Sequence, residues 1–331
     1  MRETLMAALC AAVLPPLLAA CSPFTVLNAT GDGGRLRAEG VPYGPEPGQL
    51  LDVYGPGAAA GAPAAGWPAP GTPAAGWPAP GSPSASSTGG APVVVFFYGG
   101  SWRSGSRADY AFVGAALAAR GIVTMVADYR RYPQVVYPAF LQDSARAVAW
   151  TLAHAARYGG DARRVFVAGH SAGAYNAAMV ALDPRWLGAC DVTPAALAGW
   201  IGMAGPYDFL PLTSRSLQAV FPYPDTPADT QPIRHVSASA PPALLLAGRA
   251  DTTVDPVRNT DGLARALREA GAEVQTTGYE RLGHGLLVGA LAPGLRWRAP
   301  VLEDLARFVA ATPASRTAPA SGSCAATGLP Q

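Results

Sequence analysis

Lysine is absent from this 331-residue chain, so all 24 of its basic side chains are arginine. Its absence excludes Schiff-base chemistry, attachment of pyridoxal phosphate and a P-loop, because each of these depends on a lysine amine. A formal net charge of +2 is also too small to indicate a protein that binds nucleic acid. Since half of the residues are apolar, the chain can form a sizeable core in one large domain or two small ones.

Cysteine and histidine are scarce, with four of each. The cysteines show no CxxC spacing, so the sequence predicts no structural zinc site and no other metal site. Any catalytic imidazole must come from a short list of candidates. These are His154, His170, His235 and His284.

The N-terminus has the layout of a bacterial export signal. Arg2 precedes an apolar stretch from Leu5 to Ala20 that is interrupted by two prolines and is short for a membrane span of ~20 residues. The stretch ends in Leu-Ala-Ala-Cys, which resembles the lipobox of bacterial lipoproteins, where the cysteine is acylated and becomes the first mature residue. We therefore expect a lipoprotein signal peptide at 1–20 and a lipid anchor at Cys21. Ser22 in the next position implies, by the same resemblance, the outer membrane and its periplasmic face. An ordinary cleavage site that happens to precede a cysteine is the alternative.

Residues 55–91 consist almost entirely of Gly, Ala, Pro, Ser, Thr and Trp. They contain a tandem duplication of ten residues, PAAGWPAPGT followed by PAAGWPAPGS. Such a composition cannot bury a core, so we expect a mobile, partly polyproline insert. Trp67 and Trp77 could form a binding stripe, but duplication within a tolerated loop explains the pair more simply.

The C-terminal residues 312–331 have a similar composition, and we expect them to be disordered. After export and acylation, Cys190 and Cys324 are the two thiols that remain, so a disulfide between them is feasible in an oxidising compartment. The position of Cys324 in the tail argues against that pair.

Strand-like and helix-like runs alternate between residues 50 and 311, and the segment 21–49 leads into them. The strand-like runs are Leu50–Val53, Pro92–Phe97, Ile122–Ala127, Arg163–Ala168, Leu197–Met203, Ala243–Gly248 and Val274–Tyr279. The helix-like runs are Arg107–Arg120, Tyr137–Arg157, Ala172–Leu182, Val257–Ala270 and Val301–Ala310. This alternation predicts an α/β fold with a mostly parallel central sheet and helices on both faces. Reactive groups in such sheets lie outside the carboxyl ends of the strands.

A nucleophile motif follows the run RVFVA, where Gly169-His170-Ser171-Ala172-Gly173 comes directly before a helix-like run. G-x-S-x-G between a strand and a helix indicates a sharp turn that lifts the serine hydroxyl into a cleft. Small residues two positions before and after the serine let that turn close without a Cβ clash. We therefore predict Ser171 as the nucleophile.

A serine hydroxyl needs a base, and we favour His284. It stands between two glycines after the last predicted strand, which suits a loop that brings an imidazole close to the serine. His154 lies in a predicted helix on a solvated or packed face, and His235 in a Pro- and Ser-rich surface loop. His170 precedes the nucleophile, so its side chain should point away from the serine.

A third residue should orient the imidazole, and two acids compete for this role at the end of the run ALLLAG. Asp251 lies nearer the strand end, whereas Asp255 directly precedes Pro256 and suits a helix N-cap. We favour Asp251, with Asp208 a distant third. The chain order Ser171, Asp251, His284 is typical of α/β-hydrolases.

From about Leu50 to Ala310 the chain resembles an α/β-hydrolase of the esterase group with an HGG-type oxyanion motif. That group includes carboxylesterases related to hormone-sensitive lipase, arylformamidases and isoprenylcysteine methylesterases. The motifs that carry the resemblance are YGGSW (98–102), DYRRYP (128–133), YGGD (158–161), GHSAG (169–173), GRADTTVD (248–255) and LGHGLL (282–287). Together they are specific for the superfamily and much less so for the substrate.

The resemblance implies an oxyanion hole made by the backbone N–H groups of Gly100, Ser101 and Ala172, which would stabilise the charge that develops on the carbonyl oxygen. This chain has Tyr98 where the family usually has a histidine that braces the loop, so the bracing is open. Asp128 is either a second brace for this loop or a simple turn residue.

We expect an exported, lipid-anchored serine hydrolase that cleaves small-molecule carboxylic esters through an acyl-enzyme, without a metal or organic cofactor. The segment 206–242, rich in proline and aromatic residues, should form a small cap over the pocket. An amidase or arylformamidase is the nearest enzymatic alternative, because the same triad cleaves both kinds of bond. A non-catalytic binding lipoprotein that uses the Trp-Pro repeat is a further one.

Overall fold

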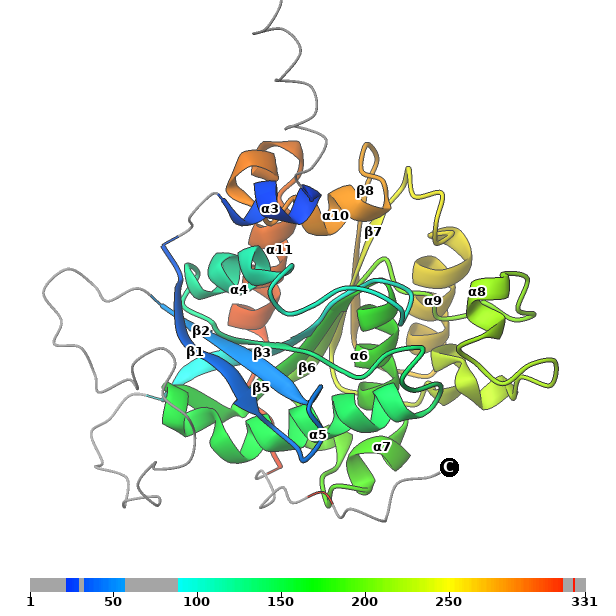
Figure 1. Ribbon diagram of the computed structural model, residues 1–331, viewed down its shortest axis with the longest axis horizontal. Coiled ribbons are helices and arrows are strands. Elements are labelled where there is room, and N and C mark those ends of the chain that lie inside the picture. Colours follow the sequence, from blue (N-terminus) through cyan, green and yellow to red (C-terminus); the bar gives the residue numbers. More distant parts are fainter. Residues whose placement is uncertain (1–21, 30–32, 57–88, 318–323, 325–331) are drawn as a thin grey trace, which may run out of the picture.

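The computed structural model describes residues 22–29, 33–56, 89–317 and 324. Within these ranges, eight strands form one sheet in the order β1-β2-β4-β3-β5-β6-β7-β8 (Figure 1). The strands are β1 (Arg35–Pro42), β2 (Leu50–Gly55), β3 (Ala91–Phe97), β4 (Val123–Ala127), β5 (Gly160–His170), β6 (Gly199–Met203), β7 (Ala243–Gly248) and β8 (Val274–Tyr279). β2 pairs antiparallel with both β1 and β4, and the remaining pairs are parallel. The predicted signal peptide, Cys21 and the Trp67/Trp77 repeat lie outside the described residues.

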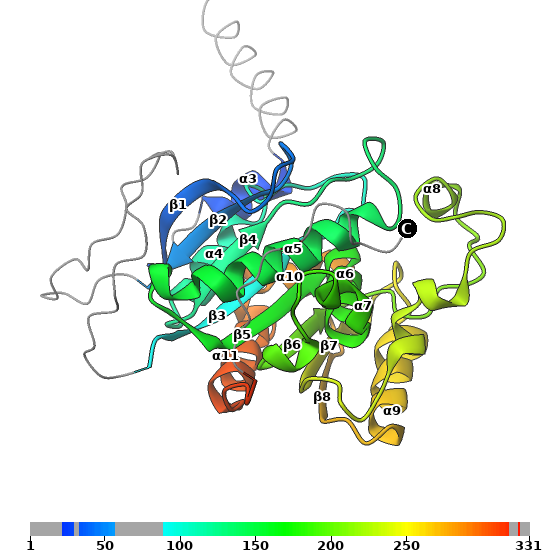
Figure 2. The same cartoon turned by 90° about the horizontal axis from the view of Figure 1, so that it is seen from below.

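The sheet is covered on both faces, which explains the continuous apolar runs of its central strands. Residues 93–97 of β3 are fully buried, as are residues 165–168 of β5 beside it. Helices α4 (Ala111–Ala118) and α11 (Val301–Ala311) contact each other over one face, and α5 (Ala139–His154) and α6 (Ala172–Leu182) pack over the other (Figures 1 and 2). The predicted α/β architecture is therefore confirmed.

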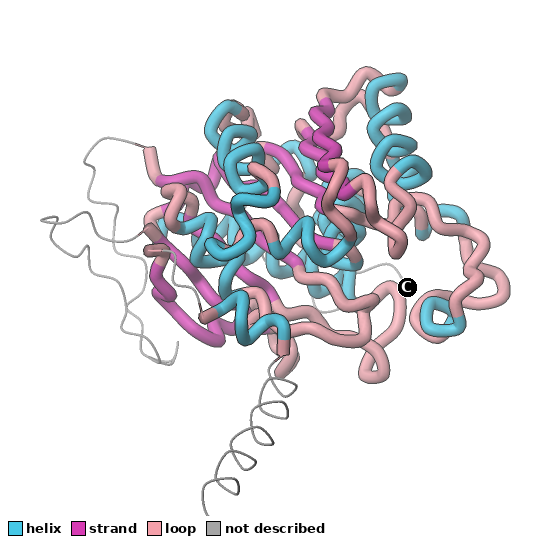
Figure 3. The backbone as a smooth tube through the Cα atoms, turned by 90° about the horizontal axis from the view of Figure 1, so that it is seen from above, coloured by secondary structure: helices cyan, strands magenta, loops and turns pink. Residues whose placement is uncertain are grey.

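The other helices are shorter or lie at the margins. They are α3 (Pro23–Asn28), α7 (Pro184–Gly188), α8 (Arg215–Gln218), α9 (Gly262–Glu269) and α10 (His284–Gly289). The segment 206–242, which holds α8, projects at the end of the molecule far from β1 (Figures 1 and 2). Figure 3 shows several long loops gathered on one side of the molecule.

Several elements differ from the sequence-based expectation. β1 was not predicted, because it is an edge strand whose residues are all partly or fully exposed and carry no continuous apolar run. The predicted helix from Val257 begins with a π-helical turn (Val257–Asp261), and α9 starts only at Gly262. His284 is the first residue of α10, so the prediction of a loop at this position is wrong.

Cys190 and Cys324 form a disulfide, so the argument from the tail position against this pair is wrong. The first residues of the predicted tail also contact the domain. The Ser315 N–H donates a 2.7 Å hydrogen bond to the carbonyl of Arg163, and its hydroxyl donates to Ala195. Within the part of the chain that the structure describes, no helix combines the length and apolar character needed to cross a bilayer.

Candidate active site

Ser171 occupies the single position between the end of β5 and the start of α6. Its backbone has φ 55° and ψ −122°, and it is one of few non-glycine residues with positive φ in the described chain. Such a conformation costs of order 1–3 kcal/mol and persists only where surrounding structure enforces it. The Ser171 N–H is held by the carbonyl of Met203 at 2.9 Å, which anchors the turn to β6.

The two glycines of the motif make this turn sterically feasible. A Cβ on Gly169 would lie 2.1 Å from the carbonyl oxygen of Gly173, and a Cβ on Gly173 would lie 2.0 Å from that of Phe97. Both distances are far below van der Waals contact. The strand, the turn and the helix can therefore approach one another only with glycine at both positions.

Ser171, His284 and Asp251 form one hydrogen-bonded chain. The Nε2 atom of His284 lies 2.8 Å from Oγ of Ser171, and its Nδ1 atom lies 2.7 Å from Oδ2 of Asp251. β7 delivers Asp251 and the start of α10 delivers His284. The Asp251 side chain is 1% exposed, and its Oδ1 atom accepts hydrogen bonds from two backbone N–H groups, those of Thr253 and Val254. The imidazole can thus take a proton from the serine while a fixed carboxylate holds it.

The competing acids have other partners. Asp255 accepts hydrogen bonds at 2.9 and 3.2 Å from the N–H groups of Val257 and Arg258, as expected of a cap on the helical segment that follows. Asp208 pairs with the Arg258 guanidinium at 3.3 Å. Neither acid contacts His284.

Two of the remaining histidines lie away from the site. His154 is the last residue of α5, and its ring stacks on that of Trp150 at a centroid distance of 4.3 Å. Of the two predicted positions for this histidine, packed or solvated, the structure shows the packed one. His235 belongs to a short 3-10 helix (Pro232–His235) and is half-buried, with its Nε2 atom 2.7 Å from the carbonyl of Asp229. The predicted surface loop at His235 is therefore a helical turn.

His170 lies beside the triad, and no role for it was predicted from the sequence. Its Nε2 atom lies 3.1 Å from the backbone carbonyl of His284, and the two rings are 4.9 Å apart. Burial, with a smaller contribution from the nearby His284, lowers the pKa of His170 to about 3. The ring is therefore neutral, and because a carbonyl can only accept, its proton lies on Nε2. His170 therefore holds the main chain of His284, whose imidazole contacts Ser171.

The YGGSW loop has an unusual backbone. φ is +128° at Gly100, 52° at Ser101 and 56° at Trp102. A Cβ on Gly100 would lie 2.2 Å from the carbonyl oxygen of Ser104, so no other residue fits there without a shift of the loop. The N–H groups of Gly100, Ser101 and Ala172 donate no hydrogen bond to any described residue, which leaves all three available to a ligand.

The segment that follows β4 braces this loop. The Tyr129 hydroxyl donates a hydrogen bond to the carbonyl of Tyr98 at 2.8 Å, and the Tyr132 N–H donates to the carbonyl of Trp102 at 2.9 Å. The Arg131 guanidinium donates to the carbonyl of Gly105, just after the loop. Asp128 accepts from the Arg107 N–H at 2.8 Å and pairs with its guanidinium at 2.5 Å. Asp128 is thus a brace just beyond the loop, and the direct supports are residues that the sequence did not single out.

Tyr98 supports the loop by packing. Its ring lies between those of Tyr129 and Tyr110, at centroid distances of 4.8 and 5.8 Å. The hydroxyl is buried and has no hydrogen-bond partner among the described residues. Burial, followed by the proximity of Tyr129 and of the Asp128 carboxylate, raises the pKa of this phenol far above its usual range. Tyr98 is therefore neutral.

Trp102 ties the loop to the helices beneath it, a role that the sequence alone did not reveal. It is 1% exposed, and its indole N–H donates to Oδ1 of Asn176 on α6 at 2.9 Å. Asn176 in turn donates to the Ser144 hydroxyl on α5 at 3.2 Å. The YGGSW loop and the helix that starts after Ser171 are therefore linked by a buried polar chain.

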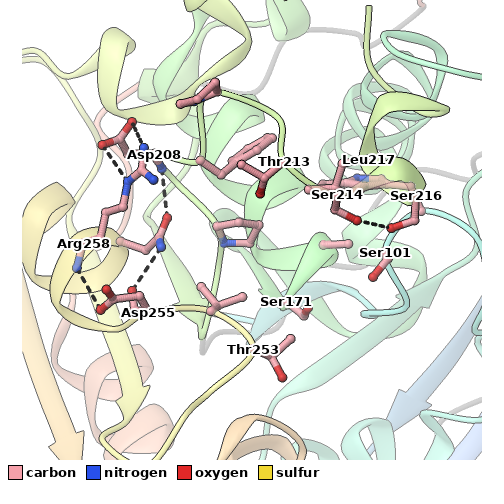
Figure 4. Close-up of a pocket in the computed structure, with 17 residues that line it drawn as sticks. Ser101, Ser171, Asp208, Thr213, Ser214, Ser216, Leu217, Thr253, Asp255 and Arg258 are labelled. Atoms are coloured by element: carbon pink, nitrogen blue, oxygen red, sulfur yellow. Dashed lines mark hydrogen bonds and ion pairs between the residues drawn. The ribbon is translucent and has the colours of Figure 1, made fainter. Parts of the chain in front are cut away.

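A cavity of about 540 Å³ opens in front of Ser171 (Figure 4). Loop residues Ser101 and Thr253 line it near the serine, and the Asp208–Arg258 pair forms part of another wall. The 206–242 segment contributes most of the remaining lining, namely Pro206, Phe209, Pro211, Thr213, Ser214, Ser216 and Leu217. No group of three His, Cys, Asp or Glu side chains in the described ranges is placed to hold a metal ion.

This fold and this site define an α/β-hydrolase. A model of the BD-FAE family matches residues 82–267, more than half of the chain, and the protein belongs to that family. Among solved structures, the thermophilic esterase of the planctomycete Thermogutta terrifontis with bound butyrate superposes with a TM-score of 0.56 and 25% identity, over 67% of this chain and 84% of the esterase.

Two sequence relatives come from Mycobacterium tuberculosis. "Probable carboxylic ester hydrolase LipM" is 32% identical over 206 residues, which cover 56% of this chain and 47% of LipM. "Esterase LipC" is 30% identical over 273 residues, which cover 76% of this chain and 60% of LipC. The chain thus spans about half to three fifths of the length of these relatives.

Proposed function

We propose that the protein is a serine hydrolase that cleaves carboxylic esters. The observation that carries this function is the hydrogen-bonded chain from Oγ of Ser171 through His284 to Asp251, placed at the wall of a cavity. The names of the relatives and of the superposed esterase support the same reaction class.

The geometry supports a two-stage reaction. Oγ of Ser171 attacks the ester carbonyl carbon while Nε2 of His284 takes the hydroxyl proton and then gives it to the departing alkoxide. Asp251 accepts the Nδ1–H and stabilises the imidazolium. Water then attacks the acyl-enzyme with His284 again as base, which releases the carboxylic acid and restores Ser171.

The oxyanion formed in each stage would be stabilised by the N–H groups of Gly100, Ser101 and Ala172. Two observations support this assignment: Ser101 and Ala172 line the same cavity as Ser171, and none of the three N–H groups donates a hydrogen bond to a described residue. Removal of one such donor typically costs ~10²–10³ in rate.

A cavity of about 540 Å³ suits a small-molecule ester, since ligand pockets usually enclose ~300–1,000 Å³. The 206–242 segment would act as a cap that shapes this pocket, which is supported by the several of its residues that line the cavity. Its serine and threonine side chains give the cavity polar as well as apolar walls.

We further propose that the enzyme is exported and held at the outer membrane, facing the periplasm, by acyl chains on Cys21. The lipobox-like Leu-Ala-Ala-Cys supports the anchor. The Cys190–Cys324 disulfide supports an oxidising compartment, because such bonds persist mainly outside the cytosol.

The reaction class is tested by two measurements on one preparation. A fluorophosphonate probe should label the wild type and not Ser171→Ala, and labelling of the variant would remove Ser171 as nucleophile. The wild type should hydrolyse p-nitrophenyl esters of short acyl chains in preference to N-formyl arylamines. Strong cleavage of the formylamines with weak ester cleavage would make the protein an amidase of the same fold.

A further inference from the structure

A second cavity, of about 640 Å³, is lined in part by His170 and His284 but not by Ser171, which lines the first cavity. It is bounded mainly by α3 and α10, with Leu295 from the 3-10 helix Pro293–Arg298 at one side. Its lining is almost wholly apolar, and it includes Pro23, Phe24, Val26, Leu27, Leu286 and Val288. Figure 1 shows α3 against α10 at one end of the molecule. Of its lining residues, only His284 takes part in the proposed mechanism, and His170 holds the main chain of His284.

Exposed apolar side chains also occur on these three elements, and two of them, Val26 and Leu286, line the cavity itself. Six large apolar side chains are exposed in the described part of the chain, and three of them belong to the three elements named above. Val26 of α3 is 62% exposed, Leu286 of α10 is 38% exposed, and Trp297 of the 3-10 helix is 75% exposed. We call the surface formed by Pro23–Asn28, His284–Gly289 and Pro293–Arg298 the apolar face. A folded protein rarely leaves such a patch open unless it meets a partner or a membrane.

The charge of the apolar face favours a lipid surface. Its three elements contain no acidic residue, and the 3-10 helix carries Arg296 and Arg298. The Arg298 guanidinium lies 4.6 Å from the centroid of the Trp297 ring. Exposed tryptophan with adjoining arginine is the combination that partitions to the headgroup region, where the ring meets acyl chains and the guanidinium meets phosphate.

The course of the chain points to the same partner. α3 begins at Pro23, only two residues after Cys21, so an acyl anchor on that cysteine would emerge beside the apolar face. We propose that the apolar face docks the enzyme on the surface of an anionic bilayer. This proposal rests on the proposed function for the lipid anchor at Cys21. The exposed apolar residues and the positive charge of the apolar face do not depend on that function.

The docked face can be read out with an environment-sensitive fluorophore. Trp297→Cys and Leu286→Cys in the full chain would each be labelled with a nitrobenzoxadiazole thiol reagent. Tyr223→Cys is the matched control, because Tyr223 is 56% exposed but belongs to the 206–242 segment. The unsubstituted chain, labelled in parallel, gives the background from other thiols. Esterase activity of each variant in solution reports that the fold is intact.

On vesicles of phosphatidylethanolamine and phosphatidylglycerol, we expect a blue shift and a several-fold rise in emission at positions 286 and 297, and neither at 223. Replacing phosphatidylglycerol with phosphatidylcholine should weaken both changes, as should Arg298→Gln.

The proposal is overturned if the labels at 286 and 297 keep the emission they have in water when the protein is bound to vesicles, if position 223 responds equally, or if the chain does not bind vesicles. Changes that occur without lipid as protein concentration rises would instead assign the face to a second copy of the chain. Absence of esterase activity in the unsubstituted chain, together with the expected response of the labels at 286 and 297, would contradict the proposed reaction and leave the docking face standing.

Discussion

The Nδ1 atom of His284 lies 2.7 Å from Oδ2 of Asp251, and the other oxygen of that carboxylate is held by two backbone N–H groups. Asp251 is therefore fixed before it meets the imidazole. Asp255, four residues later in the same loop, is turned toward the N–H groups of the next helical segment. The two carboxylates of this loop thus have separate hydrogen-bond partners.

Replacement of these two acids should separate catalysis from stability. Asp251→Asn should lower kcat by about 10³–10⁴-fold, because an amide cannot both accept the Nδ1–H and stabilise the imidazolium. Asp255→Asn should lower kcat less than ~10-fold, since asparagine also caps helices. Steady-state kinetics on a p-nitrophenyl ester and a urea denaturation curve measure the two effects. A larger kcat loss in Asp255→Asn would assign the orienting role to Asp255.

The buried His170 makes a testable contribution to stability at acidic pH. Its folded pKa of about 3 lies below the value of about 6.5 for an unfolded chain. Between pH ~6.5 and pH ~3 the unfolded state therefore binds a proton at this histidine that the folded state does not. Protonation of His170 thus leaves the free energy of unfolding unchanged above pH ~6.5 and decreases it as the pH drops from there toward 3. Between pH 7.5 and 5.0 this histidine alone should reduce the free energy of unfolding by about 2 kcal/mol.

His170→Gln isolates this contribution to stability, because glutamine keeps an N–H donor for the His284 carbonyl but does not titrate. Urea denaturation at both pH values should show a smaller loss of stability in the variant than in the wild type. Equal losses would mean that His170 is protonated in the folded state as well.

The sequence predicted the buried parts of this fold well, for identifiable physical reasons. Strands such as β3 and β5 are covered on both faces and so appear as continuous apolar runs, and the glycines at 169 and 173 follow from the steric demands of the turn. β1 escaped prediction because an edge strand needs no apolar run. The supports of the oxyanion loop, including Tyr129 and Trp102, were also missed. Their roles depend on contacts between residues about 30 to 75 positions apart, which no local pattern encodes.

Tyr98 tests whether the departure from the family's histidine has a catalytic consequence. Its ring is packed between two tyrosines, and its hydroxyl has no hydrogen bond within the described chain. Tyr98→Phe should therefore change kcat less than ~10-fold, and stability should stay equal or rise slightly, because a buried hydroxyl without a partner is costly. A fall in kcat of ~100-fold with unchanged KM would make the hydroxyl part of transition-state stabilisation.

Two variants of the YGGSW loop distinguish the contribution of its backbone N–H groups from that of its side chains. Ser101→Ala keeps the same N–H at φ 52° and removes only the hydroxyl, so kcat should fall less than ~10-fold. Gly100→Ala should be severe, with a fall in kcat of ~10²–10³-fold, because a Cβ at φ +128° would collide with the carbonyl of Ser104 and displace the N–H donors. Fluorophosphonate labelling of Gly100→Ala should be slow but detectable, since Ser171 and His284 remain in place. If Gly100→Ala keeps wild-type kcat while Ser101→Ala loses it, the Ser101 hydroxyl and not the backbone would be the donor to the oxyanion.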